Sequence, residues 1–435
     1  MPKNPGRSIW RGRLTVLAGL IILALNLRAA VTTVSPMLDR IRAEVAFSPL
    51  TESLIATAPP LMFAIFGSLA PLAGRRWGLE RVIAGAMGIA ALATAARAVT
   101  GDELVFLITT VLVMAGLGMA NVTIPPLVKR YFPDRVGLMT TASTLFLVAG
   151  QAIPPAFAVP LADRLGWRWA IGVWAIGAAL AGLPWIVQPY RRGRRQRQGE
   201  TGGPGRSRAR AHGRARASAG AGSGGSGHVD LHNAGPGPAR VFRAPSFWGI
   251  AGLLTCNSVA AYALMGWLPQ IMIDAGASHQ KASACLAVFT AGSLVPALVA
   301  PVLTVRLKRL WPVFVVMFVC WVGGLAGLAL SPLHGTWWWI VLTRIGDGNY
   351  ACALTLMNLR TRRTETLLAV SGFAQAIAYI CAALATFAFG QLYAGTQGWG
   401  WPLALLACTM PLGLVGGIVA ARRTYVEDQE LQRSA

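Results

Sequence analysis

Residues 14–36 read LTVLAGLIILALNLRAAVTTVSP, an apolar run that is long enough to cross a lipid bilayer as one helix. One permanent charge, Arg28, lies deep inside this run, about 21 Å from its start at about 1.5 Å per residue. A charge at that depth costs about 2.5 to 3.5 kcal/mol by insertion scales, and its side chain does not easily reach the membrane surface. We therefore expect Arg28 either to line the pathway of a polar solute or to pair with a carboxylate on another helix.

The composition is that of a multi-pass membrane protein. The 435 residues are 54% hydrophobic and 13% charged, with a mean hydropathy of +0.54. The apolar runs are continuous and lack the alternation of lipid-facing β-strands, so the sequence predicts an all-α integral membrane fold with twelve transmembrane helices. The predicted spans are 14–36, 51–73, 82–100, 104–126, 138–160, 167–188, 246–272, 280–303, 311–331, 337–359, 366–390 and 400–421.

Basic residues are distributed unevenly between the two sides of this predicted bundle. Of the 39 Lys and Arg residues, 31 fall in the terminal segments, the central segment and every second loop, 6 fall in the opposite loops, and 2 lie inside spans. Because Lys and Arg concentrate in cytoplasmic loops, both termini are predicted to be cytoplasmic. Arginine outnumbers lysine 35 to 4, which is typical of a GC-rich bacterial genome and favours the bacterial plasma (inner) membrane. The net charge of +23 therefore reflects topology, and we expect no nucleic-acid partner.

The chain divides into two halves joined by a polar segment. Residues 191–244 are rich in Arg and Gly and almost free of apolar side chains, which predicts a disordered cytoplasmic linker between residues 1–190 and 245–435. Matching residues recur in the two halves at nearly one offset, namely Asn26 with Asn257, Asn121 with Asn349, and Trp167 with Trp399. Such repeats predict two parallel six-helix bundles with a binding site between them.

Few polar side chains are available inside the spans to form a site. The guanidinium fork of Arg28 suits a carboxylate, a cyanate or a nitro group. The other candidate substrate-binding residues are the donors Asn26, Asn121 and Gln375, and the aromatic side chains Tyr262, Trp267 and Tyr379. For each of these residues, a hydrogen bond between helices is the alternative interpretation.

Arg344 and Asp347 lie three residues apart in the tenth predicted span, on one helical face. One interpretation is a neutralised pair that makes insertion of both charges tolerable. The other is that Asp347, the only acid well inside a span, carries a coupling proton with Arg344 as its partner.

The sequence contains no motif typical of metal binding, of nucleotide binding or of histidine-based catalysis. The six cysteines fall singly in separate C-terminal spans without CxxC spacing, so we predict no metal site. No P-loop is present, and no histidine lies inside a predicted span. We therefore expect no cofactor and no enzymatic activity.

Several motifs together identify a family. They are Asn26-Leu27-Arg28 with Val34-Ser35-Pro36, Pro125–Arg130 with Phe132–Met139, Leu161–Arg164 with Gly166–Trp169, Tyr262-Ala263 with Trp267-Leu268-Pro269, and Ser371-Gly372 with Gln375 and Tyr379. The set resembles the cyanate/nitroimidazole transporter family of the major facilitator superfamily. The resemblance covers both halves and implies the major facilitator fold, in which two six-helix bundles rock about a central site in a monomer.

The loop between spans 2 and 3 departs from the superfamily pattern G-x-x-x-D-R-x-G-R-R. Gly74, Arg75 and Arg76 fit this pattern, whereas Pro71 and Leu72 occupy its acidic and basic places. We therefore do not expect the usual charge contact of this loop with a neighbouring helix. We expect a gate formed by Gly74, Arg75 and Arg76 together with packing.

The expected function is secondary active or facilitative transport of a small organic anion or nitro-aromatic-like solute of the cyanate type, by alternating access. The expected partners are that substrate, the lipid bilayer and, if Asp347 carries them, protons. A proton-coupled drug exporter is the first alternative, although spans 1, 4 and 5 lack the acids typical of that class. A transporter-like solute receptor is the second, although neither terminal segment is long enough for an output domain.

Overall fold

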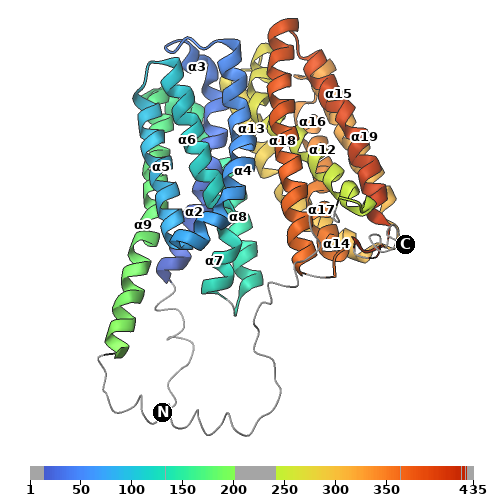
Figure 1. Ribbon diagram of the computed structural model, residues 1–435. Helices are drawn as coiled ribbons and strands as arrows, with labels where there is room; N and C mark the ends of the chain where they lie inside the picture. The colour runs from blue at the N-terminus through green and yellow to red at the C-terminus, as the bar shows by residue number, and fades with distance from the viewer. Residues whose placement is uncertain are drawn as a thin grey trace, which may run out of the picture.

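The computed structural model describes residues 14–132, 134–200, 242–362, 364–422, 424–426 and 428, and these residues form two helical bundles side by side without any strand (Figure 1). The first bundle contains α2 (Leu14–Val34), η1 (Ser35–Met37), α3 (Leu38–Arg42), α4 (Pro49–Trp77), α5 (Leu79–Val99), α6 (Glu103–Asn121), α7 (Ile124–Tyr131), α8 (Val136–Leu165) and α9 (Trp167–Glu200). The second contains α12 (Pro245–Asp274), α13 (His279–Ala291), α14 (Leu294–Arg306), α15 (Trp311–Leu330), α16 (Thr336–Gly346), α17 (Gly348–Leu359), α18 (Thr364–Thr396) and α19 (Gly400–Ala421).

The predicted all-α membrane fold is confirmed, and the eighth and tenth spans are each divided into two helices. Within the described residues, 11 helical segments are long and apolar enough to cross a membrane. The remaining predicted span, 337–359, is not one helix, because α16 and α17 meet at Asp347. The eighth span is likewise divided, since α13 ends at Ala291 and α14 begins at Leu294. With the α16 and α17 pair counted as one span, the described residues contain twelve candidate spans.

Short connections keep sequential helices antiparallel. Between α4 and α5 the chain turns at Gly78, whose φ of +84° is a conformation that favours glycine. At the opposite end of α4, the Ser48 hydroxyl accepts a hydrogen bond from the Thr51 amide at 3.2 Å and so caps the helix. Each bundle thus has two distinct ends. We call the end with α3 and the start of α4 the α3 end, and the opposite end the linker end (Figure 1).

The helix α9 extends further than the predicted start of the linker. It continues past residue 190 to Glu200, where the sequence analysis had placed a disordered segment. Arg and Gln, which dominate 191–198, are good helix formers, and this local propensity accounts for the extension. Most of the predicted linker, residues 201–241, lies outside the described residues, so its predicted disorder stays a prediction.

Two pairs of helices join the bundles. The helix α4 packs against α18, and α8 packs against α13, while each bundle keeps a separate hydrophobic core. The faces of α2 and α12 that lie between these two pairs form the centre of the molecule. This arrangement brings Arg28 of α2 opposite α12.

Candidate functional site

Arg28 joins the two bundles at the middle of the molecule. Its Nη1 donates a hydrogen bond to the hydroxyl of Tyr262 in α12, at 2.9 Å. Its guanidinium carbon lies 5.1 Å from the ring centroid of Phe63 in α4. The Nε atom is buried and has no hydrogen-bond partner among the described residues. Arg28 therefore retains unused hydrogen-bonding capacity.

The side chains around Arg28 are aromatic and neutral. The Tyr379 ring centroid lies 6.0 Å from that of Tyr262 and 6.5 Å from that of Phe63. Tyr350 of α17 completes the set of tyrosines that interact electrostatically with the guanidinium group. No carboxylate in the described part of the chain forms an ion pair with Arg28 within 4.0 Å. An anionic solute here would therefore not compete with a protein carboxylate.

A cavity of about 540 Å³ lies between the bundles on the linker side of these aromatic residues. Its walls come from α4 and α18, with Phe63 and Tyr379 at its inner limit. Gln375 lines the cavity and donates from Nε2 to the Ser371 hydroxyl at 2.8 Å. Ser68, which also lines the cavity, is exposed, and Arg28 lies outside the cavity with its guanidinium group over the ring of Phe63.

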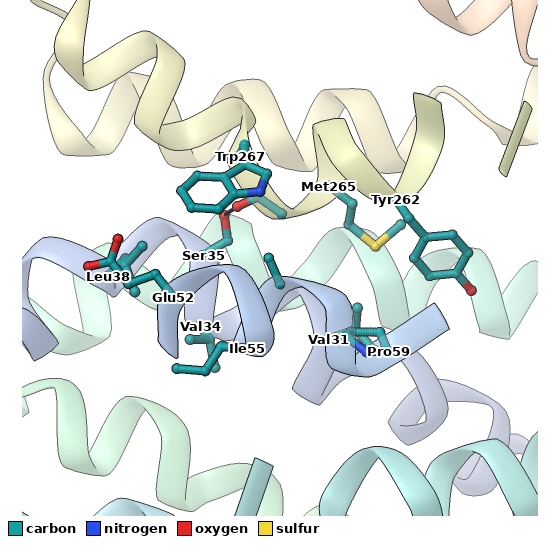
Figure 2. Close-up of a pocket in the computed structure, with 12 residues that line it drawn as sticks. Val31, Val34, Ser35, Leu38, Glu52, Ile55, Pro59, Tyr262, Met265 and Trp267 are labelled. Carbon is teal, nitrogen blue, oxygen red and sulfur yellow. Dashed lines mark hydrogen bonds between the residues drawn. The ribbon is translucent and has the colours of Figure 1, made fainter. Parts of the chain in front are cut away.

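On the α3 side of Arg28 a small cavity of about 40 Å³ lies between the bundles. Figure 2 shows Tyr262 at one end of it and Glu52 at the other, with Ser35 and Trp267 between them. Arg42 forms a two-pronged ion pair with the Glu52 carboxylate. This part of the pathway is too narrow for a solute of several atoms.

Direct contacts between the bundles close the α3 end. The Ser35 hydroxyl donates to the Gly266 carbonyl at 2.5 Å, and Gln391 donates from Nε2 to the Ser53 hydroxyl at 3.0 Å. A further hydrogen bond runs from the Ser283 hydroxyl to the carbonyl oxygen of Pro155. The structure is therefore closed at the α3 end and open toward the linker end.

The remaining predicted substrate residues lie at different places. Asn26 is buried on another side of α2, where its amide donates to the Trp174 carbonyl in α9 at 3.5 Å. Asn121 is the last residue of α6, next to Val122, which lines the linker-side cavity. Trp267 lines the small α3-side cavity and is only 2% exposed. The structure thus gathers Arg28 with tyrosines rather than with asparagines.

Arg344 and Asp347 form the local pair that their spacing predicts. The Arg344 Nη1 atom lies 3.1 Å from the Asp347 carboxylate, and their side chains are only 7% and 11% exposed. The Arg344 guanidinium carbon also lies 3.5 Å from the ring centroid of Phe289. The Asp347 carboxylate forms its ion pair with Arg344, and it forms none with Arg28.

The predicted gate residues lie at the linker end of α4. The Gly74 carbonyl accepts a hydrogen bond from the Gly78 amide at 3.1 Å, and the guanidinium group of Arg76 lies over the Trp77 ring at 5.7 Å. The Arg75 side chain lies outside the described part of the structure. The backbone of these residues lies beside the turn between α4 and α5, and their role as a gate stays a prediction.

A different charge contact lies next to this loop, and it comes from a residue outside the motif. Glu80 in the first turn of α5 accepts a hydrogen bond from the Tyr131 hydroxyl at 2.6 Å and an ion pair from Arg130 at 3.3 Å. This contact binds the start of α5 to α7 within the first bundle. The sequence analysis missed Glu80, although an acid shortly after the Gly-Arg-Arg motif was a signal for it.

Two membrane-spanning bundles with a charged residue and a solvent-connected cavity between them define the class of membrane transporters. Residues 20–386 match the sequence profile of the Major Facilitator Superfamily, and the chain belongs to this family. It is 28% identical to the 2-nitroimidazole transporter of Escherichia coli (strain K12), over 95% of this chain and 96% of the relative. It is 24% identical to the cyanate transport protein CynX of the same organism, over 87% and 89%.

Solved structures share the same fold at low sequence identity. A bacterial homologue of the human lysosomal transporter Spinster, in an inward-facing and occupied conformation, has a TM-score of 0.69 at 13% identity and covers 98% of this chain and 99% of its own. A D-xylose-proton symporter has a TM-score of 0.68 at 12% identity and covers 96% and 99%. The major facilitator fold and the multi-pass membrane location of the chain follow from these findings.

Proposed function

We propose that this transporter moves a small organic anion or a nitro-substituted solute, with Arg28 as the residue that binds its negative oxygen atoms. The observation that carries the proposal is the position of Arg28 between the two bundles. It lies next to the side chains at the inner limit of the linker-side cavity, and it has no carboxylate partner in the described structure. A guanidinium group offers paired donors that match two oxygen atoms of a carboxylate or nitro group. The similarity to two relatives, a 2-nitroimidazole transporter and a cyanate transport protein, supports this substrate class.

In the transport cycle that we propose, the pathway is closed alternately at the α3 end and at the linker end. In the observed state a solute enters from the linker-side cavity and meets Arg28, where it takes over donors now directed at Tyr262 or left unused. Rocking of the bundles then separates Ser35 from Gly266 and Ser53 from Gln391, and closes the linker-side cavity. The uneven distribution of Lys and Arg supports a cytoplasmic linker end and cytoplasmic termini, in a bacterial inner membrane.

Counterflow in proteoliposomes tests the substrate class. Vesicles that contain the purified full chain are loaded with unlabelled solute, and the entry of labelled 2-nitroimidazole or cyanate is measured. We expect saturable exchange of at least one of these two solutes, and none of the neutral sugar xylose. Protein-free vesicles give the background. Exchange of xylose alone, or no exchange of either proposed solute by folded protein, contradicts the proposal.

A second prediction concerns the closure at the α3 end, which Gly390 of α18 permits. A Cβ atom at Gly390 would meet the Ser53 side chain and lie 2.6 Å from Cζ2 of Trp267. We therefore expect Gly390→Leu to hold the α3 end apart and to reduce counterflow at least about tenfold, because the observed closed state becomes unreachable. A thiol reagent added from the α3 side should label a cysteine introduced at Ala56 faster in this variant.

The matched control is Gly395→Leu, in the same helix, since a Cβ atom there meets nothing within 4 Å. This variant should exchange solute at nearly the wild-type rate, with unchanged labelling at Ala56. Normal counterflow in Gly390→Leu would show that closure at Ser53 and Trp267 is not part of the cycle.

A further inference from the structure

A third cavity lies on the outer surface of the first bundle, away from the transport pathway. It has a volume of about 460 Å³ and lies between α4, α5 and α6. Its lining is almost entirely apolar and includes Phe66, Gly85, Ile89 and Leu112. Ile89 and Leu112 are 50% and 43% exposed, so this groove faces the hydrocarbon of the bilayer.

The length of the groove corresponds to one leaflet of the membrane. Along α5 its lining runs from Arg81 at the linker end to Ile89, which spans about 12 Å at about 1.5 Å per residue. Half of a hydrocarbon core of about 30 Å is about 15 Å. The groove therefore extends from headgroup depth at the linker end to about the middle of the bilayer, as one lipid acyl chain does.

Two arginines lie at the headgroup end of this groove. Arg81 is exposed and lines it, and Arg76 lies over the ring of Trp77, which also lines the groove and is 58% exposed. Neither arginine forms an ion pair within the described part of the chain. The adjacent acid, Glu80, is already bound by Tyr131 and Arg130.

We propose that this groove binds an anionic phospholipid of the leaflet at the linker end. One acyl chain lies along Gly85 and Ile89, and the phosphate and its anionic headgroup lie between Arg76 and Arg81. Trp77 supplies an aromatic side chain at the boundary between hydrocarbon and headgroup, where tryptophan is favoured. Basic residues near the membrane surface attract anionic lipids, so the two arginines provide a preference for negative over zwitterionic headgroups.

Native mass spectrometry of the purified full chain with defined lipids tests this site. We expect phosphatidylglycerol to be retained at least about fivefold more than phosphatidylcholine of the same acyl chains. The variant Arg76→Gln/Arg81→Gln should bind both lipids equally, because it keeps the groove and removes the charge. Phosphatidylglycerol should also raise the melting temperature of the wild-type protein more than that of this variant.

A glycine in the groove provides the test of acyl-chain binding. A Cβ atom at Gly85 or at Gly88 meets nothing within 4 Å, so a larger side chain at either position starts in open space. Gly85→Leu fills the groove and should reduce retention of both lipids, whereas Gly88→Leu, which does not line it, should bind them as the wild type does.

Four results would each overturn the proposal. They are equal retention of the two lipids by the wild type, a phosphatidylglycerol preference that survives in Arg76→Gln/Arg81→Gln, unchanged binding in Gly85→Leu, and displacement of the lipid by 2-nitroimidazole. The last result would make the groove part of a solute pathway. A dimer that Gly85→Leu dissociates would instead assign the groove to a second copy of the chain. All of these readouts are independent of transport activity.

Discussion

Arg28→Gln is expected to weaken solute binding by about 1.5 to 3 kcal/mol, roughly 10- to 150-fold in Kd, while the protein keeps its thermal stability. These values are typical of hydrogen bonds to a charged group. Stability should be retained because the described structure shows no carboxylate paired with Arg28, and its visible partner is the neutral hydroxyl of Tyr262. The loss of that hydrogen bond is offset by removal of a charge that is costly inside the membrane.

Two further variants distinguish the effect of the positive charge of Arg28 on binding from the effect of its planar guanidinium group and its hydrogen bond. Arg28→Lys restores the positive charge without the planar fork, so it should recover only part of the binding. Tyr262→Phe removes the acceptor at 2.9 Å but leaves the guanidinium group free for the solute, so binding should change by less than in Arg28→Gln.

The measurements are Kd and melting temperature of each purified variant, with and without 2-nitroimidazole or cyanate. A loss of stability in Arg28→Gln, with ligand binding retained in the folded fraction, would show that the arginine is structural and contradict its role in binding.

The fold was predictable because each transmembrane helix can be recognised from the length of its own apolar segment. The exceptions are the eighth span, which divides between α13 and α14, and the tenth span, where α16 and α17 meet at Asp347. The positions of Arg344 and Asp347 within the span were visible in the sequence, but hydropathy averaged over a whole span does not reveal a local break. The local pairing of these residues was predictable, since residues three apart on a helix are neighbours.

The candidate site was predictable only in its central residue. The cost of burying Arg28 follows from its own segment, whereas its contact with Tyr262 joins positions 234 apart in the chain. Such contacts depend on how each helix is rotated about its own axis. A span that is apolar on all sides gives no pattern from which this rotation can be predicted. For this reason Asn26, two residues from Arg28, was grouped with it although it faces α9. Phe63 was missed because an isolated phenylalanine in an apolar span carries no signal.

Asp347→Asn is expected to lower the free energy of unfolding by about 3 to 5 kcal/mol, which is typical when one partner of a buried ion pair is removed. The reason is that Arg344, which is 6% exposed, would keep its charge without its carboxylate. The double variant Arg344→Met/Asp347→Asn removes both charges and should recover most of the stability. The exposed pair of Arg40 with Asp163 supplies the control, and Asp163→Asn should change stability by less than about 1 kcal/mol.

The same variants decide between a structural pair and a proton carrier. If Asp347 carries a coupling proton, Asp347→Asn should fold normally, lose uphill accumulation and keep counterflow, which needs no net proton movement. We expect a different result for Asp347→Asn. The free energy of unfolding should fall, and uphill accumulation and counterflow should both decrease in proportion to the amount of folded protein. Chemical unfolding in mixed micelles, alongside both transport assays, measures each quantity separately. The Asp347 carboxylate lies 3.1 Å from a permanently charged guanidinium group, so a proton-carrying role would require this ion pair at the junction of α16 and α17 to break. A stable Asp347→Asn variant without uphill transport would contradict this interpretation.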